Sequence, residues 1–371
     1  MEKIRAILID DEVHFRKEIA TLFEGHERVD VVGVAQSGRI GLQKIAREHP
    51  DIILLDLDMP EMSSLQAIQS IRESHSDIPI IIFSQRCGEN TDLLLDAIAA
   101  GAADHIMKPV RSEWQVARDS FAEELATKIV TLCPKDGKSG FNRRKAPHGS
   151  HGIDDSQRGG VRISSPEIAI IAIGVSTGGP NALAEIVPKL PADLGVPIVC
   201  VQHMPAGFTK ILAQRLDTTS QLSVFEGEDG MRLEPNTMYI APGEYHMQVA
   251  LAGKRYVLRL NQEPAENSCR PAVDPLFRSV ARHFGERALG VILTGMGSDG
   301  LLGAEALKNE GATILAQDKK TSVVWGMPGY VVERGLADSV LPLQEMAAEL
   351  TRRVRRSASR ARIGQNGVEV E

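Results

Sequence analysis

The chain has 371 residues, of which 43% are hydrophobic and 25% charged, and its formal net charge is −7. This length exceeds what one ordinary core needs, so we expect a globular protein of two domains. The negative charge argues against generic nucleic-acid binding, and no apolar stretch reaches the roughly 20 residues of a membrane-spanning helix, so we expect no membrane insertion.

The acidic charge and the cysteines add two further constraints. Residues 1–110 hold 19 acidic and 11 basic residues, a balance of −8, whereas the remainder holds 30 and 31. Cys87, Cys133, Cys200 and Cys269 form no close pair, which argues against a zinc site or a disulfide framework. Isolated cysteines suit a reducing compartment, and the N-terminus offers no apolar leader, so we predict a cytoplasmic protein.

Residues 1–127 alternate strand-like and helix-like segments. The strand-like runs, in chain order, are IRAILID, VDVVGVA, DIILLDL, IPIIIFS and DHIMK. Strands that alternate with helices predict a parallel sheet with helices on both faces. We therefore predict that residues 1–127 form an α/β domain with a parallel five-stranded sheet.

Polar residues stand at the ends of four of these strands: Asp10, Asp11, Asp56, Ser84 and Lys108. Ligands of an open α/β sheet collect at the carboxyl ends of its strands. Three carboxylates at one edge repel each other unless a hard cation lies between them, and Mg²⁺ suits such a site. One carboxylate could then attack a phosphoryl group and form an aspartyl phosphate, whose oxygens Lys108 and Ser84 would hold.

In this order and spacing, these residues resemble the response-regulator receiver domain over about residues 1–127. The resemblance implies a flavodoxin-like fold. It also implies a role for each residue: phosphoacceptor Asp56, Mg²⁺ ligands Asp10, Asp11 and Asp56, switch residues Ser84 and Lys108, and a cis Lys108–Pro109 bond. The chain departs from the family pattern in the segment MPEMSSL, which lacks the usual Asp/Asn-Gly, and at Gln85, where a small residue is common.

Two segments are expected to lie outside the folded domains. Residues 128–166 are rich in Gly, Ser and charge from Pro134 onward and hold almost no large apolar residues, so we predict a flexible linker. Residues 351–371 include the run RRVRRSASRAR, which predicts a basic, disordered tail. Electrostatic docking of that tail is the alternative.

Residues 167–350 form a second block of strands and helices. Its strand candidates are EIAIIAIGV, VPIVCVQ, TMYIA, YVLRL, ALGVILTG and ATILAQD. The segment TMYIAPGEYHMQVALAGKRYVLRL is expected to form a small antiparallel element. We predict that it inserts into a doubly wound, mostly parallel α/β sheet.

The first strand of this block runs into a glycine-rich turn, GVSTGG, which has two interpretations. Gly174, Ser176 and Gly178 match Gly-x-Ser-x-Gly, the strand-to-helix turn that exposes a nucleophilic serine. Glycine-rich turns also bind phosphate at a helix N-terminus. A phosphate loop would need a lysine after the glycines, whereas Pro180 and Asn181 stand there, which weakens the nucleotide interpretation.

A nucleophilic serine needs a base, and the base needs a group that orients it. His203 follows the strand VPIVCVQ, and Asp299 lies just beyond ALGVILTG. Since the carboxyl ends of parallel strands face one crevice, we predict a triad of Ser176, His203 and Asp299. His246 and His283 are competing bases: His246 could line the site, whereas His283 suits packing or the surface. The chain order Ser, His, Asp differs from that of the α/β-hydrolases.

The negative oxygen of a tetrahedral intermediate needs hydrogen-bond donors. Thr177 follows the serine at a helix start, and Met296 lies in the glycine-rich turn TGMGSDG, so both backbone N–H groups are candidates. Glycines in that turn would let the backbone approach a substrate closely.

The segments AIGVSTGG, VQHMPAGFT, MYIAPGEYHM, CRPAVDPLF, GVILTGMGSDG and VVWGMPG resemble the catalytic domain of the chemotaxis protein-glutamate methylesterase/glutaminase family. The resemblance spans about residues 167–350. It implies Ser176 as nucleophile, His203 as base and Asp299 as orienter, with Thr177 and Met296 at the oxyanion. Arg270 matches a family motif near the substrate, although Ala272 stands where serine is more common.

The resemblance implies a phosphorylation-activated serine hydrolase that demethylates glutamate methyl esters, and deamidates specific glutamines, on methyl-accepting chemotaxis receptors. Its phosphodonor would be the chemotaxis histidine kinase. We expect Mg²⁺ at the receiver domain and no cofactor for hydrolysis. The alternatives are a response regulator whose second domain only binds a nucleotide or a partner, and a serine hydrolase for another ester or amide.

Overall fold

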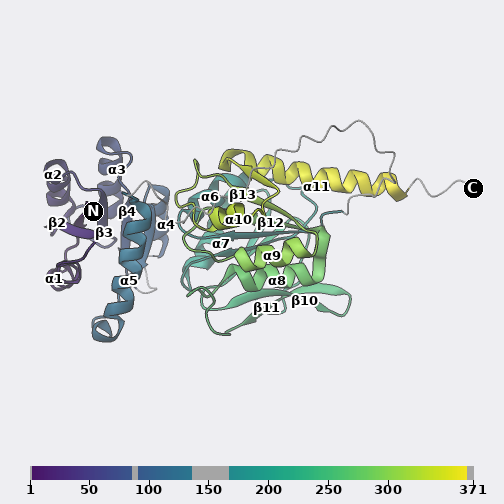
Figure 1. Cartoon of the computed structure of the whole chain (residues 1–371), viewed down its shortest axis with the longest axis horizontal. Coiled ribbons are helices and arrows are strands. Elements are labelled where there is room, and N and C mark those ends of the chain that lie inside the picture. The colour runs from purple at the N-terminus through teal and green to yellow at the C-terminus, as the bar shows by residue number, and fades with distance from the viewer. Residues whose placement is uncertain (1, 86–90, 136–166, 366–371) are drawn as a thin grey trace, which may run out of the picture.

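The computed structural model describes residues 2–85, 91–135 and 167–365. In its N-terminal domain, all strand pairs are parallel and the strand order is β2-β1-β3-β4-β5 (Figure 1). The strands are β1 (Ile4–Ile9), β2 (Val29–Ala35), β3 (Ile52–Asp56), β4 (Ile80–Ser84) and β5 (Asp104–Met107). Apart from Arg5 in β1 and the polar residues that end β3 and β4, these three strands are apolar, because helices bury both faces of the sheet. The five-stranded parallel sheet predicted from the sequence is confirmed.

Within the described residues, five helices cover this sheet: α1 (Val13–Leu22), α2 (Gly38–Glu48), α3 (Ser64–Ser74), α4 (Thr91–Ala99) and α5 (Trp114–Leu132). Because α5 reaches Leu132, the prediction that the linker begins at residue 128 is wrong. Ile129 is fully buried, and Lys128 pairs with Asp104 at 2.7 Å, so this last turn belongs to the domain. The predicted linker from residue 136 to 166 lies outside the described residues.

The C-terminal domain contains a seven-stranded sheet in the order β14-β13-β12-β6-β7-β9-β8, with parallel pairs throughout. Its strands are β6 (Ile170–Val175), β7 (Ile198–Gln202), β8 (Ser223–Glu226), β9 (Thr237–Ile240), β12 (Ala288–Ile292), β13 (Thr313–Gln317) and β14 (Ser339–Leu341). The short edge strands β8 and β14 were not predicted, since four and three residues give little periodic pattern.

The predicted antiparallel element is a single hairpin, β10 (His246–Ala252) with β11 (Arg255–Asn261), which forms its own two-stranded sheet. TMYI, expected to share it, is β9 of the parallel sheet. The helices of this domain are α6 (Gly179–Ile186), α7 (Phe208–Thr219), α8 (Val273–Phe284), α9 (Leu301–Asn309), α10 (Met327–Glu333) and α11 (Leu343–Gln365), with short 3₁₀ turns at Val187–Lys189 and Gly285–Arg287.

The basic C-terminal segment is helical as far as Gln365, so the predicted disorder is wrong for residues 351–365 (Figure 1). This segment is helical because α11 has an apolar stripe that packs on the C-terminal domain, and Leu350 and Val354 are buried members of that stripe. Within the described parts of the chain, no helix combines the length and apolarity needed to cross a membrane.

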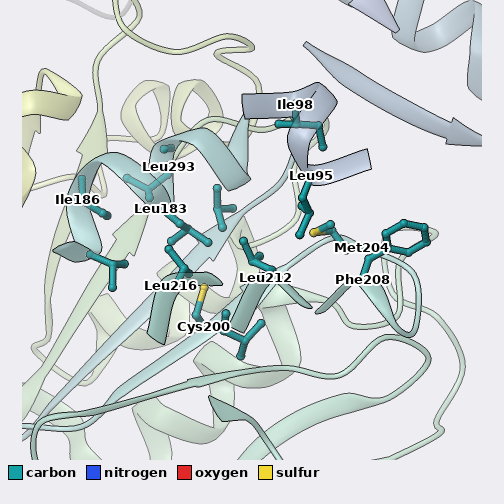
Figure 2. Packing of buried hydrophobic residues seen from close by; sticks show 14 of the residues in the cluster. Leu95, Ile98, Leu183, Ile186, Cys200, Met204, Phe208, Leu212, Leu216 and Leu293 are labelled. Carbon is teal, nitrogen blue, oxygen red and sulfur yellow. The ribbon is translucent and has the colours of Figure 1, made fainter. Parts of the chain in front are cut away.

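The two domains pack directly on each other through α4, which lies against α6 and α7. Figure 2 shows Leu95 and Ile98 of α4 near Met204 and Phe208, and all four side chains belong to one buried apolar cluster. Arg215 of α7 adds ion pairs to Asp92 at 3.5 Å and Asp96 at 2.8 Å. The N-terminal domain therefore packs on the helices that follow β6 and β7.

Candidate active site

The glycine-rich turn after β6 is shaped around Ser176. Gly178 has a φ of 77°, which favours glycine, and a side chain there would also collide with Val323. A Cβ on Gly179 would lie 1.8 Å from Oε1 of Gln202. The space inside the turn is thus filled by a side chain of the domain itself, which supports the nucleophile interpretation over a phosphate cradle.

Gln202 is the last residue of β7 and is nearly fully buried. Its Nε2 donates hydrogen bonds to the backbone carbonyls of Ser176, at 3.0 Å, and of His203, at 3.2 Å. One side-chain amide therefore ties together the two strand ends that carry the candidate nucleophile and base. Its one signal in the sequence is a polar residue at the end of an apolar strand.

His203 and Asp299 form a close pair. Nε2 of His203 lies 2.7 Å from Oδ2 of Asp299, which is only 2% exposed. Burial alone would raise the pKa of Asp299, but hydrogen bonds from His203 and from the backbone of Val273 and Asp274 lower it below its usual range. Burial likewise opposes charge on His203, yet the hydrogen bonds to Asp299 and Cys269 raise its pKa, and so favour the imidazolium that a general base becomes.

The structure brings the predicted triad and oxyanion residues to one cavity of about 860 Å³, lined by Ser176, Thr177, His203, Met296 and Asp299 among others. Among the described residues, the hydroxyl of Ser176 makes no hydrogen bond to the imidazole. Nδ1 of His203 instead contacts Sγ of Cys269 at 3.5 Å. The backbone N–H groups of Thr177 and Met296 have no partner in the described part of the chain, so both are available to an oxyanion.

The two residues predicted for the substrate region behave differently. Arg270 lines the cavity, but its Nη1 donates to the carbonyls of Gln262 and Glu263. His246 does not reach the cavity, so the prediction that it lines the site is wrong. It is 1% exposed on β10, where Nδ1 accepts the N–H of Ala272 and Nε2 lies 3.1 Å from a backbone carbonyl. His246 therefore supports the start of α8.

The N-terminal domain forms the opposite wall of this cavity. Residues from α4, β5 and α5 line it, including Ile98, Asp104 and Lys128. The hydroxyl of Thr177 donates to Oδ2 of Asp104 at 2.8 Å, across the domain boundary. Asp104 is buried, and although burial would raise its pKa, the neighbouring Lys128 lowers it. The N-terminal domain thus places a carboxylate beside Thr177, the residue that follows the candidate nucleophile.

The three acidic residues predicted to cluster in the N-terminal domain lie close together. Asp10, Asp11 and Asp56 offer oxygen atoms within 4.8 Å of one another. Nζ of Lys108 lies 2.6 Å from Asp10 and 2.8 Å from Asp56, while Ser84 is buried at the end of β4. Burial, opposed by Lys108, raises the pKa of Asp56 to about 7. Three carboxylates facing one ammonium leave excess negative charge on oxygen donors, and this set fits Mg²⁺.

One expectation at this site is wrong. Arg270–Pro271 is the cis peptide bond of the described residues, and Lys108–Pro109 is not cis. Lys108 already reaches both carboxylates from a trans bond, which X–Pro bonds prefer by default.

Four further residues that line the cavity were not predicted as site residues: Asp104, Gln202, Asn267 and Cys269. Asp104 sits in the other domain, so no local pattern connects it to Ser176. Asn267 and Cys269 lie in a loop, where neither strand nor helix periodicity applies.

Comparisons with known proteins find relatives of both domains. Residues 171–350 match the family model of the CheB methylesterase, and residues 6–117 match that of the response regulator receiver domain. The chain is 41% identical over 360 residues to a protein-glutamate methylesterase/protein-glutamine glutaminase of Trichodesmium erythraeum, covering 95% of this chain and 100% of the relative. A Nocardioides relative with the same name is 41% identical over 364 residues, covering 96% and 97%. Among solved structures, the CheB methylesterase catalytic domain of Thermotoga maritima is 46% identical, with a TM-score of 0.49, covering 51% of this chain and 98% of that chain.

Proposed function

Since this chain belongs to the protein-glutamate methylesterase/protein-glutamine glutaminase family, we propose that Ser176, His203 and Asp299 carry out its hydrolytic reaction. The substrates are γ-glutamyl methyl esters, and certain glutamines, on the cytoplasmic helices of chemoreceptors. The observation that carries the proposal is the His203–Asp299 pair, 2.7 Å apart, in the same cavity as Ser176 at the ends of adjacent strands.

The reaction follows from the atoms available. Nε2 of His203 is held by Asp299, so Nδ1 is the nitrogen left to take the proton of Ser176. The serine oxygen attacks the ester carbonyl, and the backbone N–H groups of Thr177 and Met296 stabilise the negative oxygen. The imidazolium returns the proton to the leaving group, which departs as methanol from an ester or ammonia from an amide. Water then hydrolyses the acyl-enzyme, and a glutamate carboxylate and free Ser176 result.

The direct test of this function is methanol release from methylated receptor membranes. A fluorophosphonate probe adds a second readout, because it forms a covalent bond with an activated serine. Release of methanol together with labelling at Ser176 supports the enzyme. Nucleotide binding without labelling would instead support the non-catalytic alternative, which the side chain of Gln202 inside the glycine turn disfavours.

Regulation follows from the position of the receiver. We propose that the unphosphorylated receiver restricts access of the receptor to Ser176, since α4, β5 and α5 form one wall of the cavity. The phosphodonor is the chemotaxis histidine kinase, and Asp56 receives the phosphoryl group. Lys108 follows β5 directly, and β5 begins with Asp104, which binds Thr177. A change in the partners of Lys108 can therefore reach the interface along one short strand.

Asp10, Asp11 and Asp56 would hold Mg²⁺. The ion supplies charge neutralisation for the phosphoryl oxygens and for the crowded carboxylates.

We expect phosphorylation of Asp56 by a small-molecule phosphodonor to require Mg²⁺. Without a divalent cation, an anionic phosphodonor approaches three carboxylates whose only nearby ammonium, among the described residues, is Lys108. Incorporation of phosphate should be measured with Mg²⁺, with excess EDTA, and with EDTA followed by Mg²⁺. Equal incorporation in the first two reactions would contradict the proposed ligand set.

Acidic pH is expected to weaken docking of the receiver through His105. Its ring lies 6.1 Å from that of Phe208 across the interface. Burial and the ammonium of Lys128 lower the pKa of His105 to about 4, despite the opposing charge of Asp104. An undocked histidine has a pKa of about 6.5. Protonation therefore favours the undocked form, and docking is lost progressively as pH falls below about 6.5, by about 10-fold at pH 5.5.

The measurement is the radius of gyration of the unphosphorylated chain against pH, for the native chain and for His105→Asn. The native chain should expand as pH falls, and the variant should change less. Burial raises the pKa of Glu124, and protonation of Glu124 therefore favours docking at low pH. This effect is the same in the native chain and in His105→Asn. Identical pH curves would mean that His105 does not control docking.

A further inference from the structure

Two buried aspartates contact each other, although the reaction uses only one of them, Asp299. Asp299 is 2% exposed and Asp274, on the first turn of α8, is 1% exposed. Oδ1 of Asp274 accepts the N–H of Gly303 at 2.6 Å, and the N–H of Asp274 donates to Asp299 at 3.1 Å. Burial, with the charge of Asp299 as a smaller cause, raises the pKa of Asp274 to about 6. A neutral donor that serves both groups favours their anionic forms without adding charge.

Asn267 supplies that donor. Its Nδ2 lies 3.0 Å from Oδ2 of Asp274 and 3.0 Å from Oδ1 of Asp299. A carboxamide nitrogen carries two hydrogens, so each can serve one carboxylate, whereas its oxygen could serve neither. Oδ1 of Asp299 thus accepts from the Asn267 side chain as well as from the backbone N–H groups of Asp274 and Gly300. Oδ2 is left to His203 and to the N–H of Val273.

The backbone around Asn267 fixes this orientation. Glu266 and Cys269 exchange both backbone hydrogen bonds, at 3.1 and 2.9 Å, across Asn267 and Ser268, whose φ angles are 51° and 61°. This is a two-residue turn with both central residues left-handed, for which asparagine is among the preferred residues. Both guanidinium nitrogens Nη1 and Nη2 of Arg278 bind the carboxylate of Glu266, which attaches the turn to α8.

We propose that Asn267 is a positioning residue for ester hydrolysis: it orients Asp299 toward His203 and stabilises the anionic form of that pair. This inference rests on the proposed function and assigns a role that the triad alone does not include. Other titratable and charged groups surround the pair, and their charges also influence its pH dependence. They are Asp274, Glu266, Arg278, Cys269, Asp104 and Lys128.

The sign of the effect on the pH profile follows from charge. The active form of the pair, neutral His203 with ionised Asp299, carries one net negative charge, and its protonated form carries none. Loss of the donor from Asn267 destabilises the negative form more, so the apparent pKa of the pair rises. The acidic limb of activity should therefore shift to higher pH.

The test compares Asn267→Asp and Asn267→Gly with the native full chain. Both replacements tolerate a positive φ, so the turn can persist while the donor is lost. We expect kcat to fall by about 10-fold to 100-fold, the loss for one hydrogen bond to a charged group, while KM changes little. The acidic limb should shift upward in both variants, and further in Asn267→Asp, which adds a third carboxylate.

Asn236→Gly is the matched control. Asn236 also has a positive φ, of 60°, and its Oδ1 accepts the N–H of Gly195 at 2.6 Å, but it precedes β9 and does not line the cavity. The Asn236→Gly variant should lose about as much stability as the Asn267 variants and keep the pH profile of the native chain. The ratio of variant to native activity across about pH 5.5 to 8.5 removes effects of receiver docking that the proteins share.

Two results would overturn the inference: acidic limbs of both Asn267 variants that coincide with the native one, or an equal shift in Asn236→Gly. Failure of the proposed function is recognised separately, because the native chain would then release no methanol or Ser176→Ala would still release it.

Discussion

Replacement of Ser176 by alanine is expected to abolish methanol release, by at least about 10⁴-fold, because no other group in the proposed mechanism can form the acyl-enzyme. The fold should persist, since the Ser176 hydroxyl makes no hydrogen bond within the described residues and only its backbone supports the turn. Phosphorylation of Asp56 should also persist, because that site lies in the other domain. The measurements are methanol release, fluorophosphonate labelling, thermal unfolding and phosphate incorporation.

Asp299→Asn is the informative companion to this variant. The imidazole loses the partner that stabilises its charged form, but the attacking serine remains, so residual activity should exceed that of Ser176→Ala. Asp299 also accepts backbone N–H groups from Val273, Asp274 and Gly300, so we expect a lower melting temperature as well. Near-native methanol release from Ser176→Ala would exclude the triad.

Removal of the receiver is expected to raise basal activity. A fragment that begins near residue 165 should release methanol faster than the unphosphorylated full chain, because α4, β5 and α5 no longer form a wall of the cavity. The tether makes docking intramolecular, so a modest interface suffices to keep the site largely closed. Asp56→Ala should stay near basal activity when phosphodonor is added. Methanol release is measured for all three proteins with and without phosphodonor.

A charge reversal at the interface provides a test that keeps both domains. Arg215→Glu places a carboxylate opposite Asp92 and Asp96 on α4, so docking should weaken and basal activity should move toward that of the fragment. Arg232→Glu is the matched control, because Arg232 pairs with Glu234 within its own domain. In the fragment, which lacks the receiver, neither substitution should change the rate of methanol release.

If the fragment is no faster than the unphosphorylated full chain, occlusion is wrong. The receiver would then have to activate the catalytic domain directly or recruit it to the receptor. If Arg232→Glu activates as much as Arg215→Glu, the effect belongs to surface charge rather than to the interface.

Most of the candidate site could be predicted from the order of strands and polar residues. A parallel sheet brings the carboxyl ends of its strands to one edge, whatever the connecting loops do. Ser176 and His203 directly follow adjacent strands, and Asp10 and Asp56 stand at the ends of β1 and β3. The convergence of strand ends therefore predicts both the candidate hydrolytic site and the acidic cluster. Buried parallel strands are largely apolar, so they can be predicted from the sequence without knowing which strands pair with them.

Only the tertiary structure determined the contacts made by segments that have no periodic sequence pattern. Asp104 reaches Thr177 because two domains dock, and Asn267 reaches two carboxylates because a left-handed turn faces the N-terminus of α8. His246 was misjudged because its neighbours in sequence say nothing of the α8 backbone that it binds. Residues 351–365 fold as a helix because Leu350 and Val354 find a surface to pack on, which composition alone does not reveal. Strand order follows from local patterns, whereas these contacts depend on which distant surfaces meet.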